Sequence, residues 1–356
     1  MLEKYQIHCK ERMEAGIPPL PLSVQQTSEL VDLLKVEHKE SALLLELLKE
    51  RTPAGVDQAA YVKAGFLADI TTGKTSSPYI SKKEAVIILG TMLGGYNIQP
   101  LIQCLQDDEL GENAAAALSK TLLIFDAFND VLELSESNAN AKKVIDAWAA
   151  GLWFTEKQEI PSQIKLTVYK VPGEINTDDL SPATDAWSRP DIPLHALAMF
   201  KMPREGLDKP LETIDELEKK GNPLVFVGDV VGTGSSRKSA TNSVLWHMGD
   251  DIPWIPNKKE GGFCFGGKIA PIFFNTLEDS GAFPVECDVS KLNMGQEIIF
   301  EPFNGKILDA KSGEVLSSFE LKTPVLLDEV RANARIPLII GRQLTDKTIE
   351  ALGLEP

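Results

Sequence analysis

Residues 224–240 read LVFVGDVVGTGSSRKSA. The run of β-branched and aromatic residues predicts a buried strand at 224–231, and the polar residues after the glycines predict a helix near 238–248. At such a junction the free amide groups and the positive dipole end of the helix face one point, where serine and arginine side chains also stand. The stretch therefore predicts an α/β fold with an anion pocket, although an ordinary capped strand-to-helix junction would have the same pattern.

Two nucleotide-binding motifs were compared with the sequence, and neither fits. The dinucleotide fingerprint requires a third glycine where Arg237 stands. Residues 262–268 (GFCFGGK) have the spacing of a Walker A motif, but Ile269 replaces the required Ser or Thr and no strand is expected before them. The glycine-rich segments therefore do not predict a nucleotide site.

A second polar segment comprises residues 173–182 (GEINTDDLSP) and 187–193 (WSRPDIP). Its density of Asp, Asn, Ser and Pro predicts a long ordered loop, where binding residues concentrate. Arg189 could present its planar guanidinium to a carboxylate through two hydrogen bonds. Alternatively, Asp178 or Asp179 holds Arg189 only to fix the loop. Taken together, the arginines and serines of both segments favour a small carboxylate as the ligand.

The charge of the chain restricts its partners. In 356 residues, 36 basic and 52 acidic side chains give 36 − 52 = −16, and residues 1–160 hold 15 basic and 23 acidic side chains, or −8. An acidic protein without a basic run repels phosphate backbones and anionic membranes, so nucleic acid is a poor default partner. The 43% of hydrophobic residues excludes a disordered chain, and the length predicts more than one domain.

The hydrophobic pattern predicts two domains, at 1–160 and 161–345. In the first, helical periodicity predicts helix pairs stacked as an irregular solenoid, or a plain bundle, with capping boxes at Ser23 and Ser81 and a cap at Asn97. The predicted helices lie near 23–36, 40–50, 57–71, 81–93, 97–106, 111–134 and 139–155. In the second, further strands are predicted at 164–171, 283–288, 297–303, 306–310 and 315–321, and helices at 194–202 and 211–220.

Two details complete the expected second domain. Asn304-Gly305 joins two of its strands and suits a type I′ turn. Residues 346–356 are expected to begin a linker. We expect the second domain to be α/β with a β-rich end.

Cysteine and histidine patterns predict no metal site. Cys9, Cys104, Cys264 and Cys287 lie far apart without a C-x-x-C pair, and the four histidines show no metal-ligand spacing, so we assign no histidine a role. The N-terminus has no apolar core, and no window is apolar enough for a membrane span. We therefore expect a cytoplasmic protein.

The segments TDDLSP (177–182), WSRP (187–190) and GTGSSR (232–237) resemble the swivel domain of the aconitase superfamily. The chain, from MLEKY through GTMLGGYN to RIPLIIGR, is similar to the N-terminal portion of the bacterial aconitate hydratase B family. That resemblance implies an all-α HEAT-like helical domain followed by an α/β swivel domain. It also implies three further domains, absent from this sequence, that carry a [4Fe-4S] cluster.

The resemblance implies a hydro-lyase that interconverts citrate and isocitrate through cis-aconitate in the tricarboxylic acid cycle. By this similarity, Ser235 is the catalytic base, acting as an alkoxide, and Arg189, Ser235, Ser236 and Arg237 bind substrate carboxylates. Asp178 would orient Arg189, whereas Asp179 departs from a histidine common in the superfamily. We expect this chain to bind no cluster and to be inactive alone, and the helical domain to form a homodimer or to gate the site.

Two other functions are compatible with the resemblance. The helical domain could be a module that docks proteins or RNA, since some cluster-free aconitases bind mRNA, although the charge of −8 on residues 1–160 argues against a dominant RNA role. The chain could also be the stand-alone small subunit of a split hydro-lyase.

Overall fold

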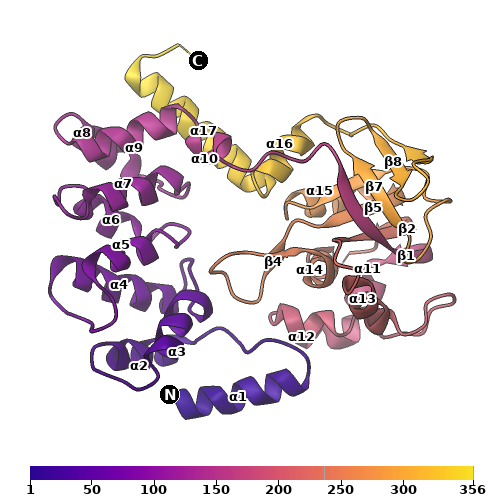
Figure 1. The fold of residues 1–356 in the computed structure, drawn as a ribbon, viewed down its shortest axis with the longest axis horizontal. Helices are drawn as coiled ribbons and strands as arrows, with labels where there is room; N and C mark the ends of the chain where they lie inside the picture. The colour runs from indigo at the N-terminus through magenta and orange to yellow at the C-terminus, as the bar shows by residue number, and fades with distance from the viewer. Residues whose placement is uncertain (236, 356) are drawn as a thin grey trace. The chain divides into compact units, whose positions relative to one another are not determined.

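The structure is a computed structural model that describes residues 1–235 and 237–355. It divides into two compact units. The first comprises residues 1–157, 253–256 and 339–355, and the second comprises residues 158–252 and 257–338. The prediction of a helical N-terminal region and a mixed α/β domain is confirmed (Figure 1). The boundaries predicted at 160 and 345, with a linker from 346, remain a prediction.

The first unit is helical. Neighbouring helices along its length contact one another in the order α2, α4, α5, α7 and α9. Its elements are α1 (Leu2–Glu14), α2 (Val24–Leu34), α3 (Ser41–Glu46), the π-helix η1 (Leu47–Arg51), α4 (Gln58–Thr72), α5 (Lys82–Leu89), α6 (Ile98–Cys104), α7 (Gly111–Lys120), α8 (Ala127–Ser135), α9 (Ala139–Ala149), α10 (Leu152–Thr155) and, from residue 339, α17 (Arg335–Leu352). The sequence predicted neither α1 nor α17.

Local signals predicted helix starts better than helix lengths. Both capping boxes are confirmed, because Ser23 accepts from the amide of Gln26 and Ser81 from that of Glu84. The predicted helix 111–134 was wrong: it is broken at residues 121–126, where Leu123 forms a parallel bridge with Gly94. A Cβ at Gly94 would lie 2.5 Å from the Leu123 carbonyl oxygen, so only glycine permits this approach.

Asn97 precedes α6, but its predicted capping role was wrong. Its side chain makes no cap hydrogen bond. The amide is fully buried and donates to the Leu89 carbonyl oxygen at 2.9 Å. Burial beside the carbonyl groups at the end of α5 and just after it, which no local pattern reveals, decides the role of this side chain.

A fully buried lysine supports the π-helix of the first unit. In a π-turn the hydrogen bonds skip one residue, which leaves carbonyl groups without their usual helical partners. Thr52 Oγ1 donates to the Leu47 carbonyl at 3.0 Å, and Lys63 Nζ, on α4, donates to the Lys49 carbonyl at 3.4 Å. Desolvation by burial lowers the pKa of Lys63 to about 8, against an ordinary value of 10.5.

We predict that Lys63→Met stabilises the chain at pH 7. The difference between 10.5 and about 8 corresponds to about 3 kcal/mol of desolvation cost, from which about 1 kcal/mol is lost with the hydrogen bond to Lys49. The free energy of unfolding, measured by urea titration, should rise by about 2 kcal/mol.

The pH dependence of stability provides the control. The unfolded wild type binds more protons than the folded protein between pH 8 and 10.5, so Lys63 makes wild-type stability rise with pH there. Lys63→Met should lack this rise, whereas Lys74→Met, at a side chain that is 73% exposed, should retain it. A Lys63→Met protein less stable than wild type at pH 7 would contradict the assignment.

The second unit is built around one mixed sheet. Its elements are β1 (Ile164–Asn176), α11 (Thr177–Leu180), the 3-10 helix η2 (Ala183–Ser188), α12 (Ile192–Ala196), α13 (Pro210–Glu218), β2 (Leu224–Thr233), α14 (Arg237–Met248), β3 (Asp250–Asp251), β4 (Lys259–Glu260), β5 (Phe263–Ile269), α15 (Pro271–Glu278), β6 (Phe283–Glu286), β7 (Glu297–Glu301), β8 (Lys306–Asp309), β9 (Val315–Ser318) and α16 (Val325–Arg331). Within the described residues, the strand order of this sheet is β6-β5-β2-β1-β7-β8-β9.

Strands β6, β5, β2 and β1 run parallel, and β7 to β9 run antiparallel. Successive residues of β2 enter different hydrophobic clusters: Phe226 packs with one, and Val225 and Val227 with the other. Both faces of β2 are therefore covered, which explains its nearly continuous apolar sequence.

One strand of the second unit was not predicted, and the predicted type of one turn was wrong. Most of the GFCFGGK segment, which the sequence analysis rejected as a nucleotide motif, is strand β5. Its Cys264 and Phe265 are buried against opposite faces of the sheet, which is why the segment is apolar. The hairpin between β7 and β8 exists, but its turn is not type I′, because Gly305 has a positive φ and Asn304 does not.

No described helix is both long and apolar enough to cross a membrane.

Candidate functional site

Both polar segments of the sequence leave the sheet at the same edge. Strands β1 and β2 are parallel neighbours, and their last residues, Asn176 and Thr233, are paired in register. α11 follows β1 directly, and α14 begins four residues after β2 ends. Because parallel strands present their carboxyl ends together, the residues that follow β1 lie beside Gly234 and Ser235, which follow β2.

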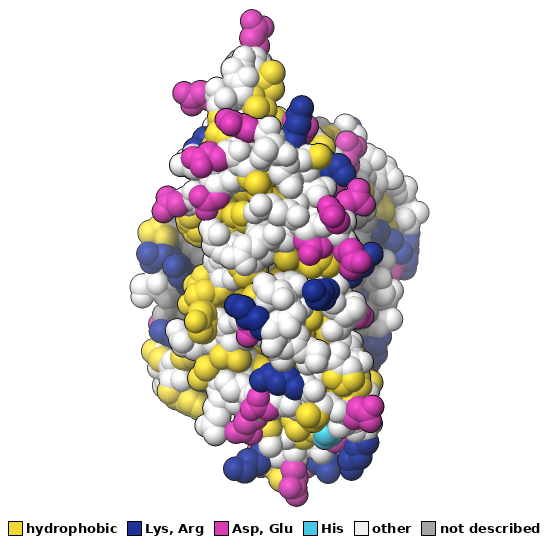
Figure 2. All heavy atoms as spheres, turned by 90° about the vertical axis from the view of Figure 1, so that its left-hand side faces the viewer, with side chains coloured by type: hydrophobic (Ala, Val, Ile, Leu, Met, Phe, Trp, Pro, Cys, Tyr) yellow, Lys and Arg dark blue, Asp and Glu magenta, His cyan; other side chains and the backbone are white. Residues whose placement is uncertain are grey.

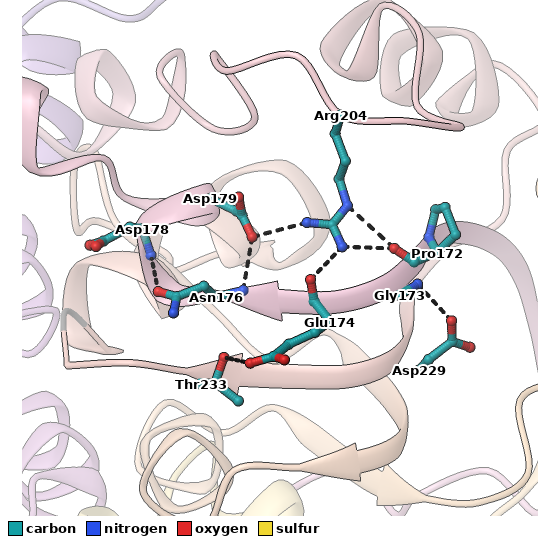
Figure 3. A network of polar contacts seen from close by, with 9 residues as sticks. All are labelled: Pro172, Gly173, Glu174, Asn176, Asp178, Asp179, Arg204, Asp229 and Thr233. Carbon is teal, nitrogen blue, oxygen red and sulfur yellow. Dashed lines mark hydrogen bonds and ion pairs between the residues drawn. The ribbon is translucent and has the colours of Figure 1, made fainter.

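A glycine allows the turn to pack closely against the loop. Gly234 has φ +108°, and a Cβ there would lie 2.5 Å from Thr177 Oγ1 and 2.6 Å from Asn176 Oδ1. One residue earlier, Thr233 Oγ1 donates to Glu174 Oε1 at 2.7 Å (Figure 3). The residues at the end of β1 and those at the end of β2 are therefore packed against each other.

Arg204, which the sequence analysis did not select, fixes the loop from the other side (Figure 3). Its Nη1 lies 3.0 Å from Asp179 Oδ2, and its Nη2 donates to the Pro172 carbonyl at 2.7 Å and to that of Glu174. Asp179 Oδ2 also accepts from the amide of Asn176 at 2.8 Å. Arg204 therefore joins the end of β1 to the first turn of α11.

These contacts bear on the two aspartates of the loop. Asp179 pairs with Arg204 and not, as one alternative proposed, with Arg189. Asp178 is exposed and points away from Arg204 in Figure 3. Arg204 stands in the irregular segment between α12 and α13. Its sequence neighbours carry no pattern that could have predicted this role.

A buried histidine connects the loop to α14. His195, on α12, is 2% exposed, and its Nδ1 lies 2.8 Å from Ser188 Oγ. Its Nε2 lies 2.8 Å from Ser181 Oγ, which in turn lies 2.7 Å from Ser239 Oγ in the first turn of α14. Desolvation and then the nearby charge of Arg189 lower the pKa of His195 below its ordinary value of 6.5, so the imidazole is neutral at pH 7.

The predicted ligand-binding residues flank this connection. Arg189 is half-buried, and its Nη2 donates to the Ser181 carbonyl at 3.4 Å. Arg237, at the start of α14, donates from Nη1 to the Ser235 carbonyl at 3.3 Å, and Ser235 is exposed. Ser236 lies outside the described residues. Ser181 thus joins Arg189 to α14, because its carbonyl accepts from Arg189 and its hydroxyl contacts Ser239.

The cysteines do not fit an iron–sulfur cluster. Cys264 and Cys287 are buried, and desolvation raises the pKa of both thiols, that of Cys287 to about 11. Cluster ligands are thiolates, which this environment disfavours. Across residues 1–235 and 237–355, no group of three or more His, Cys, Asp or Glu side chains is arranged to hold a metal ion.

We predict that Gly234→Ala separates the two site segments. The added Cβ would overlap Thr177 and Asn176 in addition to straining the backbone, so unfolding free energy should fall by about 2–4 kcal/mol. Gly313→Ala is the matched control: it has φ +73° but nothing within 4 Å of its Cβ, and should cost only about 1–2 kcal/mol. If the two variants lost equal free energy of unfolding in urea, the close approach at Gly234 would contribute nothing to stability.

We also predict that His195 makes stability depend on pH. The unfolded histidine titrates near 6.5 and the folded one at lower pH, so the unfolded chain binds more protons between these values. This contribution is complete above pH 6.5 and is lost as pH falls below it. Wild type should therefore lose more stability than His195→Gln between pH 7.5 and 5.5 in urea unfolding. An equal loss would mean that His195 is not desolvated.

Comparison with known proteins agrees with these two units. A family model described as the aconitate B N-terminal domain matches residues 4–154, and one described as the aconitate hydratase 2 N-terminus matches residues 166–356. Aconitate hydratase B of Synechocystis sp. is 61% identical over 100% of this chain and 41% of its own length. That of Escherichia coli is 58% identical over 99% of this chain and 42% of its own length.

The chain thus spans about two fifths of the length of these relatives. A crystal structure of 3-isopropylmalate dehydratase from Methanocaldococcus jannaschii covers 52% of this chain and 98% of its own, with 17% identity and a TM-score of 0.40. This likeness is too low to carry an argument.

Proposed function

The chain belongs to the family described as the aconitate hydratase 2 N-terminus, and from this we propose that it supplies one half of a hydro-lyase active site. The whole enzyme would interconvert citrate and isocitrate through cis-aconitate in the tricarboxylic acid cycle, in the cytoplasm. In this proposal the helical unit is the HEAT-like domain and the α/β unit is the swivel domain of the superfamily.

The observation that carries the proposal is the meeting of two arginine-bearing segments at one edge of the sheet. Arg189 and Arg237 come from different segments that the Ser181–Ser239 contact joins. Guanidinium groups bind carboxylates through two parallel hydrogen bonds. In a chain of net charge −16, such a local pair of cations is what a tricarboxylate requires. Ser236 is proposed to contact the same carboxylates, and Asp178 to help orient Arg189.

Ser235 is proposed as the base that accepts the proton α to a substrate carboxylate. A serine hydroxyl ionises far above neutral pH in water, so its alkoxide needs strong stabilisation. Support comes from the position of Ser235 just before α14, where helix amides and the dipole favour an anion, and from the Arg237 guanidinium, which reaches the Ser235 carbonyl. Exclusion of water by the rest of the enzyme would strengthen both effects.

The [4Fe-4S] cluster of the whole enzyme is proposed to be held elsewhere, because burial raises the pKa of the Cys264 and Cys287 thiols and so disfavours the thiolates that a cluster needs. When bound, such a cluster supplies the iron that takes the departing hydroxyl group. The chain alone should therefore be inactive. A homodimer formed through the helical unit is part of the same proposal.

The alternative of an RNA-binding module receives less support. Figure 2 shows one face of the molecule on which basic side chains stand singly or in small groups among acidic and uncharged ones. RNA binding without sequence preference needs a continuous basic surface, because it depends on neutralising several phosphates. No observation favours the other alternative, a stand-alone small subunit.

The test mixes this chain with the separately expressed, cluster-reconstituted remainder of an aconitate hydratase B and follows hydration of cis-aconitate. We expect activity from the wild-type mixture. Ser235→Ala should lower kcat by at least about 100-fold because the proton acceptor is lost. Arg237→Lys keeps the charge but loses the planar fork, so activity should fall by about 10- to 100-fold, mainly through a higher KM.

Lys238→Met is the matched control, because this exposed neighbour of Arg237 has no proposed contact with substrate. It should retain wild-type activity. A wild-type mixture that forms a complex but stays inactive would refute the proposed function. Full activity of Ser235→Ala would refute the assignment of the base.

A further inference from the structure

The hydroxyl groups around His195 determine which ring nitrogen carries the proton. Ser188 Oγ lies 2.7 Å from the Asp185 carbonyl oxygen and 2.8 Å from His195 Nδ1. The hydroxyl has one proton, and a carbonyl can only accept, so that proton goes to Asp185. The contact with Nδ1 is then a hydrogen bond only if Nδ1 carries a proton and donates it to Ser188.

The rest of the chain of hydrogen bonds follows from this first assignment. A neutral imidazole with a proton on Nδ1 has a bare Nε2, which accepts from Ser181 Oγ at 2.8 Å. The Ser181 hydroxyl then donates its proton to His195. In its contact of 2.7 Å with Ser239, the Ser181 oxygen must therefore accept and Ser239 Oγ must donate. The opposite tautomer would leave two acceptors facing each other between Ser188 and Asp185. A protonated ring would turn the Ser181 hydroxyl away from Nε2.

We propose that His195, as the neutral Nδ1–H tautomer, is a positioning residue that holds the loop carrying Arg189 against the first turn of α14. The path runs from His195 through Ser181, whose carbonyl accepts from Arg189 and whose hydroxyl accepts from Ser239. Arg237 begins the same turn, and Ser235 lies two residues before it. His195 touches no predicted ligand-binding atom and acts only through Ser181.

Burial makes this connection specific. Ser181 is completely buried and Ser188 is 4% exposed, so water cannot replace a lost partner easily. A buried hydroxyl left without a partner costs about 1–3 kcal/mol. Loss of the acceptor at Nε2 would free the Ser181 hydroxyl to turn, and the contact with Ser239 would lose its fixed direction.

Two substitutions of His195 each keep one of the two hydrogen bonds of the ring and remove the other. In His195→Gln the side-chain oxygen reaches about as far as Nε2 and can still accept from Ser181. In His195→Asn the side-chain amide reaches only about as far as Nδ1, so it can donate to Ser188 but not reach Ser181. Both variants are neutral and polar, and they differ by one methylene. His247→Gln is the control, because His247 is the histidine of α14 itself, and its Nε2 contacts the Ala196 carbonyl instead.

The first measurement needs no activity. Long-range ¹H–¹⁵N correlation spectra of the wild-type chain at pH 7 should show His195 protonated on Nδ1 and bare on Nε2. The amides of residues 241–244 are the first in α14 to have helical partners. Their hydrogen exchange should be at least about tenfold faster in His195→Asn than in His195→Gln or His247→Gln, because a tenfold ratio reflects loss of one buried hydrogen bond. A proton on Nε2, or equal exchange in the two His195 variants, would overturn the proposal.

The second measurement rests on the proposed function. In the mixture with the cluster-bearing remainder, His195→Asn should raise KM for cis-aconitate by about tenfold, and His195→Gln by no more than about threefold. Equal KM values in the two variants would overturn the positioning role at the site. If exchange differs as expected but the wild-type mixture is inactive, the link to α14 stands and the proposed function fails.

Discussion

The parallel pairing of β1 with β2 is the constraint on which the candidate site depends. It carries the chain out of both strands at the same edge, with Asn176 opposite Thr233. The Asp-rich loop and the Gly-Ser-Ser-Arg turn are far apart in sequence, yet this register places them in contact. Gly234 then allows an approach that a side chain of any size would prevent. A shift in register would separate the groups that the proposed chemistry needs together.

The arginines at this edge of the sheet carry positive charge, whereas the chain as a whole is negatively charged. The net charge of −16 disfavours an anionic ligand at long range, so binding depends on a few local cations held in place. Arg204 neutralises Asp179 and holds the strand end, whereas Arg189 donates to the Ser181 carbonyl and Arg237 to the Ser235 carbonyl. The proposed carboxylate site rests on these two arginines, which reach the same edge of the sheet from different segments.

In both units, buried polar side chains form hydrogen bonds with other buried or partly buried groups. Lys63 and Thr52 donate to carbonyl groups of a π-turn, and His195 contacts two serine hydroxyls, one at each ring nitrogen. Burial lowers the pKa of both Lys63 and His195, because it penalises the charged form of each side chain. Such groups make an arrangement specific, since any displacement leaves a donor or acceptor unpaired.

The sequence by itself determined the features that depend on neighbouring residues. These are the capping boxes at Ser23 and Ser81, the strand that leads into the helix before residue 240, and the family resemblance carried by continuous motifs. Tertiary structure alone decided the break after α7, the strand β5 and the roles of Arg204 and His195, because their partners lie far away in the chain. His195 contacts a serine of η2 and the serine after α11, and that second serine contacts α14. No spacing along the sequence encodes where these three segments meet.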